Sequence, residues 1–381
     1  MQPRIMNSNS LFRSLLFFCA VALRQNLIQA APEDLSAFLE TARAKNNYPA
    51  LAAAVVRNNQ IVALGVAGVR KFGSDEKAAL DDKFHIGSCT KSMTATLAAI
   101  LVEKGKIRWT TTLGEVFPEL KATMHADYQA VTLEQLLSHR GGVPSNLDSG
   151  GLWSRLFSNR RPTPSEQRMT LLRGVVMRAP ENPPGTKYLY SNAGVTIAGM
   201  MLERTEKVPW ETLIKQMLFE PLGMSTAGFG VQASPGKTDQ PWPHQLKDNK
   251  PSPVPPGEFA DNPPAIAPAG TVHCSVGDLA KYVAFHAHGE NANGLIKAES
   301  MKKLHQPMPG QEYALGWIVV ERPWGGGAVL THAGSNTMNY TVIWIAPKKD
   351  FGVVVETNIA GQGVEKAVDQ IVSQLIQKYL K

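Results

Sequence analysis

Runs of apolar residues separated by short turns mark both ends of the chain. Residues 51–56 and 61–68 are typical of two strands joined by a turn at 57–60. The last third returns to this pattern, with strands expected over 315–321, 328–332, 339–346 and 351–358. Strands joined by short turns pair antiparallel, because a parallel pair needs a crossover of a dozen residues or more. We therefore predict an antiparallel sheet assembled from both termini.

Helical periodicity dominates the middle of the chain. Apolar positions recur every three or four residues over 92–230, with loops between the periodic segments. An opening helix is expected at about 32–44, with Pro32 in its first turn, where its fixed φ is tolerated. A longer helix is expected to stop near Gly105, and an amphipathic helix over about 364–380 closes the chain.

Together these patterns predict an α/β (α+β) protein. An antiparallel sheet, with parts at about 31–90 and 310–381, is expected to be flanked by helices, with an inserted, mainly helical part at about 91–309. Ten prolines within 234–268 disfavour a helix or an inner strand there. We expect that segment to be a long surface loop which, with 139–165, walls the functional site.

The first thirty residues differ from the rest. Arginines precede an apolar core over 15–23, and small residues follow at Ala30 and Ala31. This is the layout of a secretory signal peptide, and its core is too short to span a bilayer. We predict a signal peptide at 1–30 and one domain at 31–381, hence a secreted or periplasmic protein without stable membrane insertion after cleavage. An uncleaved anchor is the alternative.

Composition and charge exclude several classes of protein. With 43% hydrophobic and 19% charged residues, the chain is an ordinary globular protein. Residues 1–30 contain three arginines and no acids, so cleavage would lower the net charge from +7 to +4. Basic residues do not alternate with aromatic ones in runs, so nucleic-acid binding is not expected. The nine histidines lack metal-ligand spacing, so neither a metal nor another cofactor is expected.

The candidate chemistry begins with Ser88 and Lys91, three residues apart at the expected start of a helix. Residues at this spacing share one helix face, so Lys91 can reach Ser88 Oγ. A serine hydroxyl is a weak nucleophile unless a base lies within hydrogen-bond reach. Unpaired N–H groups at a helix N-terminus also favour negative charge developing near Ser88. S-x-x-K alone also occurs by chance in many chains, as often as not on a solvated helix, so the pair indicates nucleophilic catalysis only together with its surroundings and two partners further along the chain.

Three motifs, in order, carry a resemblance to a known family. Residues 84–91 (FHIGSCTK) resemble the first motif of the serine β-lactamase and penicillin-binding protein superfamily, in its class C β-lactamase, DD-peptidase and esterase branch. Tyr190-Ser191-Asn192 is similar to that branch's second motif, Y-x-N, and His332-Ala333-Gly334 to the third, which varies from K-T-G to H-x-G. Shorter matches lie at 136–139, 221–224, 268–270 and 315–317. The resemblance covers the chain after the signal segment.

The resemblance implies catalytic roles for three side chains. Ser88 would attack a carbonyl and form an acyl-enzyme, while Lys91 and Tyr190 would share the acid and base work. An ammonium beside a phenol stabilises the phenolate, so we expect Lys91 to lower the pKa of Tyr190. Which of the two takes the serine proton is open, and Tyr190 could instead be an ordinary half-buried tyrosine.

Substrate-binding and oxyanion roles are implied for four further residues: Asn192, His332, Gly334 and Ser335. Asn192 would orient the substrate amide or the lysine, and the backbone N–H groups of Ser88 and Ser335 would form the oxyanion hole. The alternatives are a turn-capping role for Asn192 and a packing role for His332. Arg140 is expected to be a solvated loop residue, with a substrate-carboxylate contact as the alternative.

The third motif departs from that of efficient β-lactamases, which resemble one another in having Lys-Thr where this chain has His332 and Ala333. Histidine is mostly neutral at pH 7 and alanine has no hydroxyl, so the hold on a substrate carboxylate is weakened. We predict an esterase or a D-amino-acid peptidase or carboxypeptidase, acting on a small molecule or peptide such as a cell-wall fragment. The alternatives are a class C type β-lactamase and a penicillin-recognising envelope protein with little turnover.

Overall fold

The structure is a computed structural model that describes Met1, residues 31–289 and residues 294–380. The chain divides into two units, Met1–Ala31 and Pro32–Lys381, and the fold described below is that of the second. Apart from Met1, the predicted signal peptide at 1–30 lies outside the described residues. Within the described ranges, no helix is both long and apolar enough to cross a membrane.

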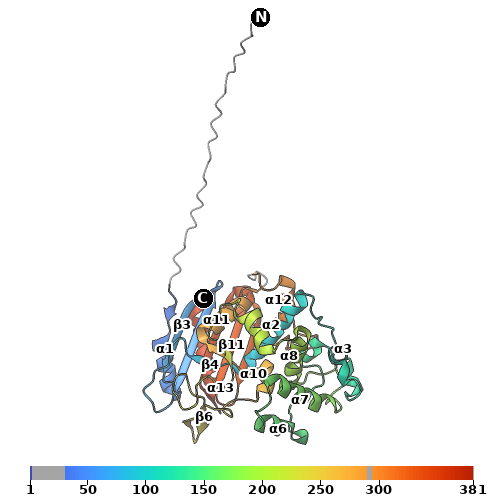
Figure 1. Cartoon of the computed structure of the whole chain (residues 1–381). Helices are drawn as coiled ribbons and strands as arrows, with labels where there is room; N and C mark the ends of the chain where they lie inside the picture. Colours follow the sequence, from blue (N-terminus) through green and yellow to red (C-terminus); the bar gives the residue numbers. More distant parts are fainter. Residues whose placement is uncertain (2–30, 290–293, 381) are drawn as a thin grey trace. The chain divides into compact units, whose positions relative to one another are not determined.

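A seven-stranded sheet forms the centre of the second unit, in the order β1-β3-β2-β12-β11-β10-β9 (Figure 1). Its strands are β1 (Glu33–Asp34), β2 (Ala50–Arg57), β3 (Gln60–Gly68), β9 (Ile318–Arg322), β10 (Gly327–Ser335), β11 (Tyr340–Ala346) and β12 (Phe351–Thr357). All neighbours are antiparallel except β1 and β3. β12 lies between β2 and β11, so strands from the two ends of the chain meet in the middle. The predicted fold class is confirmed.

Helices cover both faces of this sheet. Alternate residues of β2 belong to different apolar clusters: Leu51 packs with α1 (Ser36–Asn46) and α13 (Val364–Tyr379), and Ala52 packs with α11 (Val276–Ala287) and the helical part. Because successive strand residues point to opposite faces, a strand covered on both faces is apolar along its whole length. This explains the unbroken apolar run that marks β2 in the sequence.

The first helix begins later than the sequence predicts. The chain first adds β1 to the edge of the sheet, beside β3, and α1 begins at Ser36 instead of at Pro32. Asp34 Oδ1 accepts a hydrogen bond from the Ser36 N–H at 2.8 Å, which turns the chain between strand and helix. Pairing with the sheet edge therefore outweighs the local preference of proline for a first helical turn.

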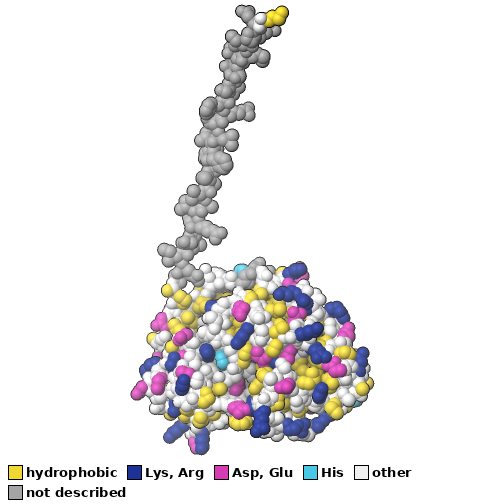
Figure 2. Space-filling model, in the orientation of Figure 1, with side chains coloured by type: hydrophobic (Ala, Val, Ile, Leu, Met, Phe, Trp, Pro, Cys, Tyr) yellow, Lys and Arg dark blue, Asp and Glu magenta, His cyan; other side chains and the backbone are white. Residues whose placement is uncertain are grey.

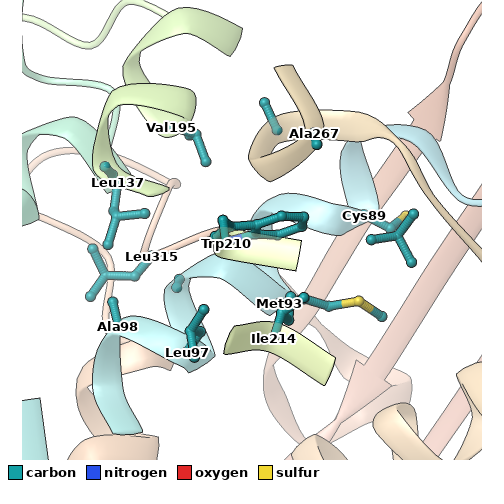
Figure 3. Close-up of a cluster of buried hydrophobic side chains, with 14 of the residues drawn as sticks. Cys89, Met93, Leu97, Ala98, Leu137, Val195, Trp210, Ile214, Ala267 and Leu315 are labelled. Atoms are coloured by element: carbon teal, nitrogen blue, oxygen red, sulfur yellow. The ribbon is translucent and has the colours of Figure 1, made fainter. Parts of the chain in front are cut away.

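The inserted part is mainly helical, as predicted. Its helices are α2 (Thr90–Glu103), α3 (Leu113–Val116), α4 (Ala126–Gln129), α5 (Leu133–Leu137), α6 (Leu152–Ser158), α7 (Pro164–Val176), α8 (Asn192–Glu206), α9 (Trp210–Ile214) and α10 (Ala267–Gly270), and α12 (Ala298–His305) follows α11. Every residue of α2 from Thr90 to Leu101 is buried. Figure 3 shows Trp210 of α9 lying among side chains of α2, including Met93 and Leu97. Such close packing holds α2 rigidly.

The proline-rich segment 234–268 differs in part from the expected loop. It contains a hairpin of β6 (His244–Lys247) and β7 (Lys250–Pro253), and β6 is the central strand of a sheet ordered β13-β6-β7, where β13 is Ile359–Ala360. The prediction that no inner strand forms here was wrong, because β6 itself has no proline. The prolines of the hairpin lie on the edge strand β7, where a missing N–H is tolerated. A third small sheet joins β4 (Lys83–His85), β8 (Val272–Ser275) and β5 (Gly228–Phe229).

Candidate active site

The structure brings Ser88 and Lys91 together, as their spacing predicts. Ser88 lies in a single 3₁₀ turn, Gly87–Cys89, which leads directly into α2. Lys91 Nζ lies 2.9 Å from Ser88 Oγ and also donates to the carbonyl of Ala269, at 2.7 Å. The Lys91 side chain is fully buried, so its ammonium is anchored on one side by a carbonyl and meets the serine on the other.

Burial sets the protonation state of Lys91. It lowers the pKa of the amine from 10.5 to about 7, because desolvation disfavours the charged form. Among the described residues, no ion pair involves Lys91, so no carboxylate offsets that cost. A substantial fraction of the amine is therefore unprotonated near neutral pH, and an unprotonated amine can accept the Ser88 proton.

Tyr190 does not have the lowered pKa that the sequence led us to expect. Burial raises its pKa above the ordinary value of 10, and a hydrogen bond with the Ser88 side chain opposes this only in part. Lys91 Nζ lies over the face of the Tyr190 ring, 4.9 Å from its centroid. The geometry thus favours a protonated phenol beside a neutral amine over a phenolate beside an ammonium.

His139 holds Tyr190 in place, a function that its sequence context did not reveal. Its carbonyl accepts a hydrogen bond from Leu189 N–H at 2.8 Å, and its Nδ1 accepts one from Ser191 N–H at 3.1 Å. Its ring centroid lies 4.4 Å from that of Tyr190. The His139 backbone is left-handed, with φ of 58°, which is uncommon for a residue with a Cβ. His139 thus contacts both chain neighbours of Tyr190 and its ring.

The backbones of the Ser88 turn and of β10 approach very closely. A Cβ on Gly334 would lie 2.6 Å from Ser88 N, and a Cβ on Gly87 would lie 2.3 Å from Ser335 N. Only glycine permits this approach, and Gly87 also has a φ of 51°. The N–H groups of Ser88 and Ser335 are thereby placed on neighbouring segments, as an oxyanion hole requires.

The side chain of His332 is committed to neighbouring protein groups. It is 3% exposed, and burial lowers its pKa to about 4, so the ring is neutral at pH 7. Nδ1 lies 2.7 Å from the Ala333 carbonyl and must carry the proton, so Nε2 accepts a hydrogen bond from the Tyr313 hydroxyl at 3.2 Å. Arg140 is likewise committed, since its guanidinium donates to the Gly185 carbonyl. The neutral His332 ring therefore offers no cation to a substrate carboxylate, and Arg140 is not among the described residues that line the cavity beside Ser88.

A cavity of about 500 Å³ opens beside the nucleophile, and three of the predicted site residues line it: Ser88, Asn192 and Ser335. The sequence predicted which loops wall the cavity but not which of their side chains line it. The lining side chains from these loops include Trp153, Phe157, Phe259 and Asp261. The aromatic residues of 139–165 and 234–268 were the available signal. Within the described residues, no group of three or more His, Cys, Asp or Glu side chains could hold a metal ion.

The model of the beta-lactamase family matches residues 35–377, and the chain belongs to that family. Protein flp of Staphylococcus aureus (strain MRSA252) is 21% identical over 356 residues, which cover 92% of this chain and 67% of that protein. Family membership supports a hydrolase in the coarse sense.

Solved structures show the same fold. The octameric penicillin-binding protein homologue from Pyrococcus abyssi matches with a TM-score of 0.72 and 24% identity, over 90% of this chain and 76% of that one. D-alanine carboxypeptidase AmpC from Burkholderia cenocepacia matches with a TM-score of 0.67 and 21% identity, over 88% of this chain and 96% of that one.

Proposed function

We propose that the protein is a serine hydrolase that cleaves an ester or an amide through an acyl-enzyme on Ser88. The observation that carries this proposal is the pairing of Ser88 Oγ, at 2.9 Å, with a buried lysine whose pKa is lowered to about 7. An amine in that state matches the requirement for a general base at neutral pH.

In the proposed reaction, Lys91 and Tyr190 pass protons between Ser88 and the leaving group. Neutral Lys91 takes the proton of Ser88 as Oγ attacks the carbonyl carbon, and the carbonyl oxygen becomes an anion held by the Ser88 and Ser335 N–H groups. Collapse of this intermediate expels the leaving group, which receives a proton from Tyr190, and the phenol regains its proton from Lys91. Water then attacks the acyl-enzyme through the same groups in reverse order.

We favour an esterase or peptidase over a β-lactamase because of the third motif. The His332 ring is neutral and hydrogen-bonded within the protein, and Ala333 has no hydroxyl, so the usual contacts with a substrate carboxylate are missing. The family relationship to a D-alanine carboxypeptidase keeps peptides from cell walls among the candidate substrates. Export through a signal peptide at 1–30, to a secreted or periplasmic location, stays part of the proposal.

The test compares the protein with its Ser88→Ala variant in the hydrolysis of p-nitrophenyl butyrate. We expect turnover that the variant loses, and a butyryl adduct on Ser88 that mass spectrometry detects after rapid acid quench. Equal rates for the two proteins would contradict the proposal. Penicillin hydrolysis with kcat/KM above about 10⁴ M⁻¹s⁻¹ would instead identify a β-lactamase, and a penicillin adduct that persists without ester turnover would identify a binding protein.

A further inference from the structure

The cavity beside Ser88 receives the acyl half of the substrate, if the proposed function holds. The leaving group must depart beside Tyr190 and Lys91, since these groups supply its proton. Neither of them lines the cavity, whereas Ser88, Asn192 and Ser335 do. The cavity therefore extends from the nucleophile along a surface that the two proton donors do not line. Its volume of about 500 Å³ is enough for a group much larger than acetyl.

Three aromatic side chains form one wall of this cavity. Trp153 and Phe157 come from α6, with ring centroids 6.4 Å apart, and Phe259 comes from the proline-rich segment, with its ring 5.6 Å from that of Phe157. Phe259 is 54% exposed, a costly position for a phenyl ring unless a partner covers it. The wall thus offers ring faces and edges to an occupant.

Arg160 fastens this wall together. Its guanidinium lies 4.9 Å from the Phe157 ring centroid and 5.6 Å from that of Phe259. Its N–H groups donate to the carbonyls of Phe157, Asp261 and Asn262 at 2.8 to 3.2 Å. A single side chain therefore joins two loops that are about a hundred residues apart in sequence. Three of its five N–H groups are used by these carbonyls, and Arg160 is not among the described residues that line the cavity.

The lining of the cavity disfavours the binding of an anion. Among the described residues that line it there is no lysine or arginine, and the charged residue is Asp261. Asp261 accepts hydrogen bonds from His85 Nε2 and Asn336 Nδ2, both at 3.0 Å. His85 Nδ1 accepts a hydrogen bond from the Gly87 N–H, so a neutral imidazole with its proton on Nε2 satisfies both contacts. Asp261 is 5% exposed and each of its carboxyl oxygens has one of these partners, so its charge lies in the cavity wall, in a described lining that has no cationic side chain.

We propose that the acyl group taken by this enzyme is an uncharged aryl group on a short chain, such as an arylalkanoyl ester or amide. The aromatic wall supplies ring contacts, and amide side chains of the lining, such as those of Asn192 and Asn336, supply hydrogen bonds. Asp261 disfavours a carboxylate. This excludes acyl groups that end in an acid, whatever the leaving group is.

Three esters with the same leaving group test this: p-nitrophenyl 3-phenylpropanoate, p-nitrophenyl butyrate and p-nitrophenyl hydrogen glutarate. We expect kcat/KM for the phenylpropanoate to exceed that for butyrate by about tenfold or more, the scale on which an apolar contact discriminates. We expect the glutarate ester to be at least about tenfold worse than butyrate. Phe157→Ala and Phe259→Ala should each shrink the aryl preference severalfold. Met177→Ala, which removes an exposed apolar side chain of the helical part, should leave it unchanged.

The outcomes separate this inference from the proposed function. Ser88-dependent turnover without an aryl preference, or with a preference for the glutarate ester, overturns the inference and leaves the serine hydrolase intact. Turnover that survives Ser88→Ala overturns the proposed function itself. The decisive measurement is the ratio of the kcat/KM values for the three esters in the unmodified protein. The test therefore does not depend on whether Phe157→Ala folds. An aryl preference that both phenylalanine variants retain also counts against the assigned wall.

Discussion

At the scale of single residues, the site depends on a lysine that the fold deprives of water. Ser88 and Lys91 could be singled out from their spacing together with the motifs around and after them. The protonation state of the amine could not be predicted, because it depends on the complete enclosure of α2. The same enclosure raises the pKa of Tyr190. It therefore favours a neutral phenol beside a neutral amine over the expected phenolate beside an ammonium. In the proposed mechanism, desolvation therefore favours Lys91 as the base and Tyr190 as the acid.

The pKa of Lys91 should be visible in the pH dependence of the reaction. Protonated Lys91 cannot accept the serine proton, so kcat/KM for p-nitrophenyl butyrate should rise about tenfold per pH unit below pH 7 and level off above it. Steady-state rates between pH 5.5 and 8.5, corrected for spontaneous hydrolysis, measure this. Lys91→Met should lower kcat/KM by about 10²- to 10⁴-fold. A flat profile across pH 7 would rule out Lys91 as the base.

His139 should matter for kcat more than for KM. His139→Ala removes the acceptor for Ser191 N–H and the ring beneath Tyr190, so Tyr190 should lose its alignment, and small misplacements cost up to about 10²-fold. The matched control is His139→Asn, since asparagine tolerates a left-handed backbone and keeps an acceptor. We expect the asparagine variant to recover part of kcat. A fall in melting temperature with kcat unchanged would show that His139 only stabilises the fold.

At the scale of elements, the site is a junction between the turn before α2 and strand β10. Cys89 Sγ donates to the carbonyl of His332 at 3.4 Å, next to the glycine contacts that bring Gly334 against Ser88. These contacts leave no room for a side chain at Gly87 or at Gly334. The alignment of the oxyanion donors is therefore a property of how a helix and a strand pack.

Gly334→Ala should test this junction. A methyl group there would meet Ile86 O at 2.0 Å and Ser88 N at 2.6 Å, both backbone atoms, so β10 must move away from the turn. Losing one oxyanion donor typically costs 10²- to 10³-fold in kcat, and we expect a loss of about that size. Ser335→Ala keeps its backbone N–H and should lose far less. Similar losses in both variants, measured with p-nitrophenyl butyrate, would contradict this assignment.

Sequence patterns predicted the elements better than they predicted the site's walls. Six of the seven strands of the central sheet, all but β1, and the helix α2 follow from the local pattern of apolar residues, which is pronounced where an element is buried on both faces or on all sides. The strand β6 and the late start of α1 depend on pairing with distant segments, which no local pattern contains. For the same reason the sequence named Ser88, Lys91 and Tyr190 but could not place Phe157 beside Phe259.

At the scale of the whole molecule, the core tolerates one acidic side chain without a partner. Glu356 of β12 is fully buried, and neither of its carboxyl oxygens has a hydrogen-bond partner among the residues that the structure describes. Burial raises its pKa well above 4.5, so the folded protein keeps it neutral. The unfolded chain ionises it at its ordinary pKa. The contribution of Glu356 to the free energy of unfolding is therefore fully present below the unfolded-state pKa. It is lost progressively as the pH rises toward the folded-state pKa.

Glu356→Gln should weaken this dependence, because glutamine does not ionise. Between the two pKa values one proton is at stake, so the free energy of unfolding of the unmodified protein falls by about 1.4 kcal/mol per pH unit from this group. Melting temperatures at pH 5, 7 and 9 should therefore decline less in the variant than in the unmodified protein. Parallel declines would mean that Glu356 is not the titrating group.

The position of β12 in the sheet has a consequence for biosynthesis. A ribosome makes β2, β3, Ser88 and Lys91 before the helical part, but β12, the partner of β2 at the sheet's centre, is made only after the helical part and β9 to β11. Cys89 and His332, which touch across the junction, are 243 residues apart. A nascent or truncated chain that ends before β12 therefore lacks the centre of the sheet, and one that ends before Ser335 also lacks a proposed oxyanion donor. The proposed hydrolytic activity should appear only after β12 has been made.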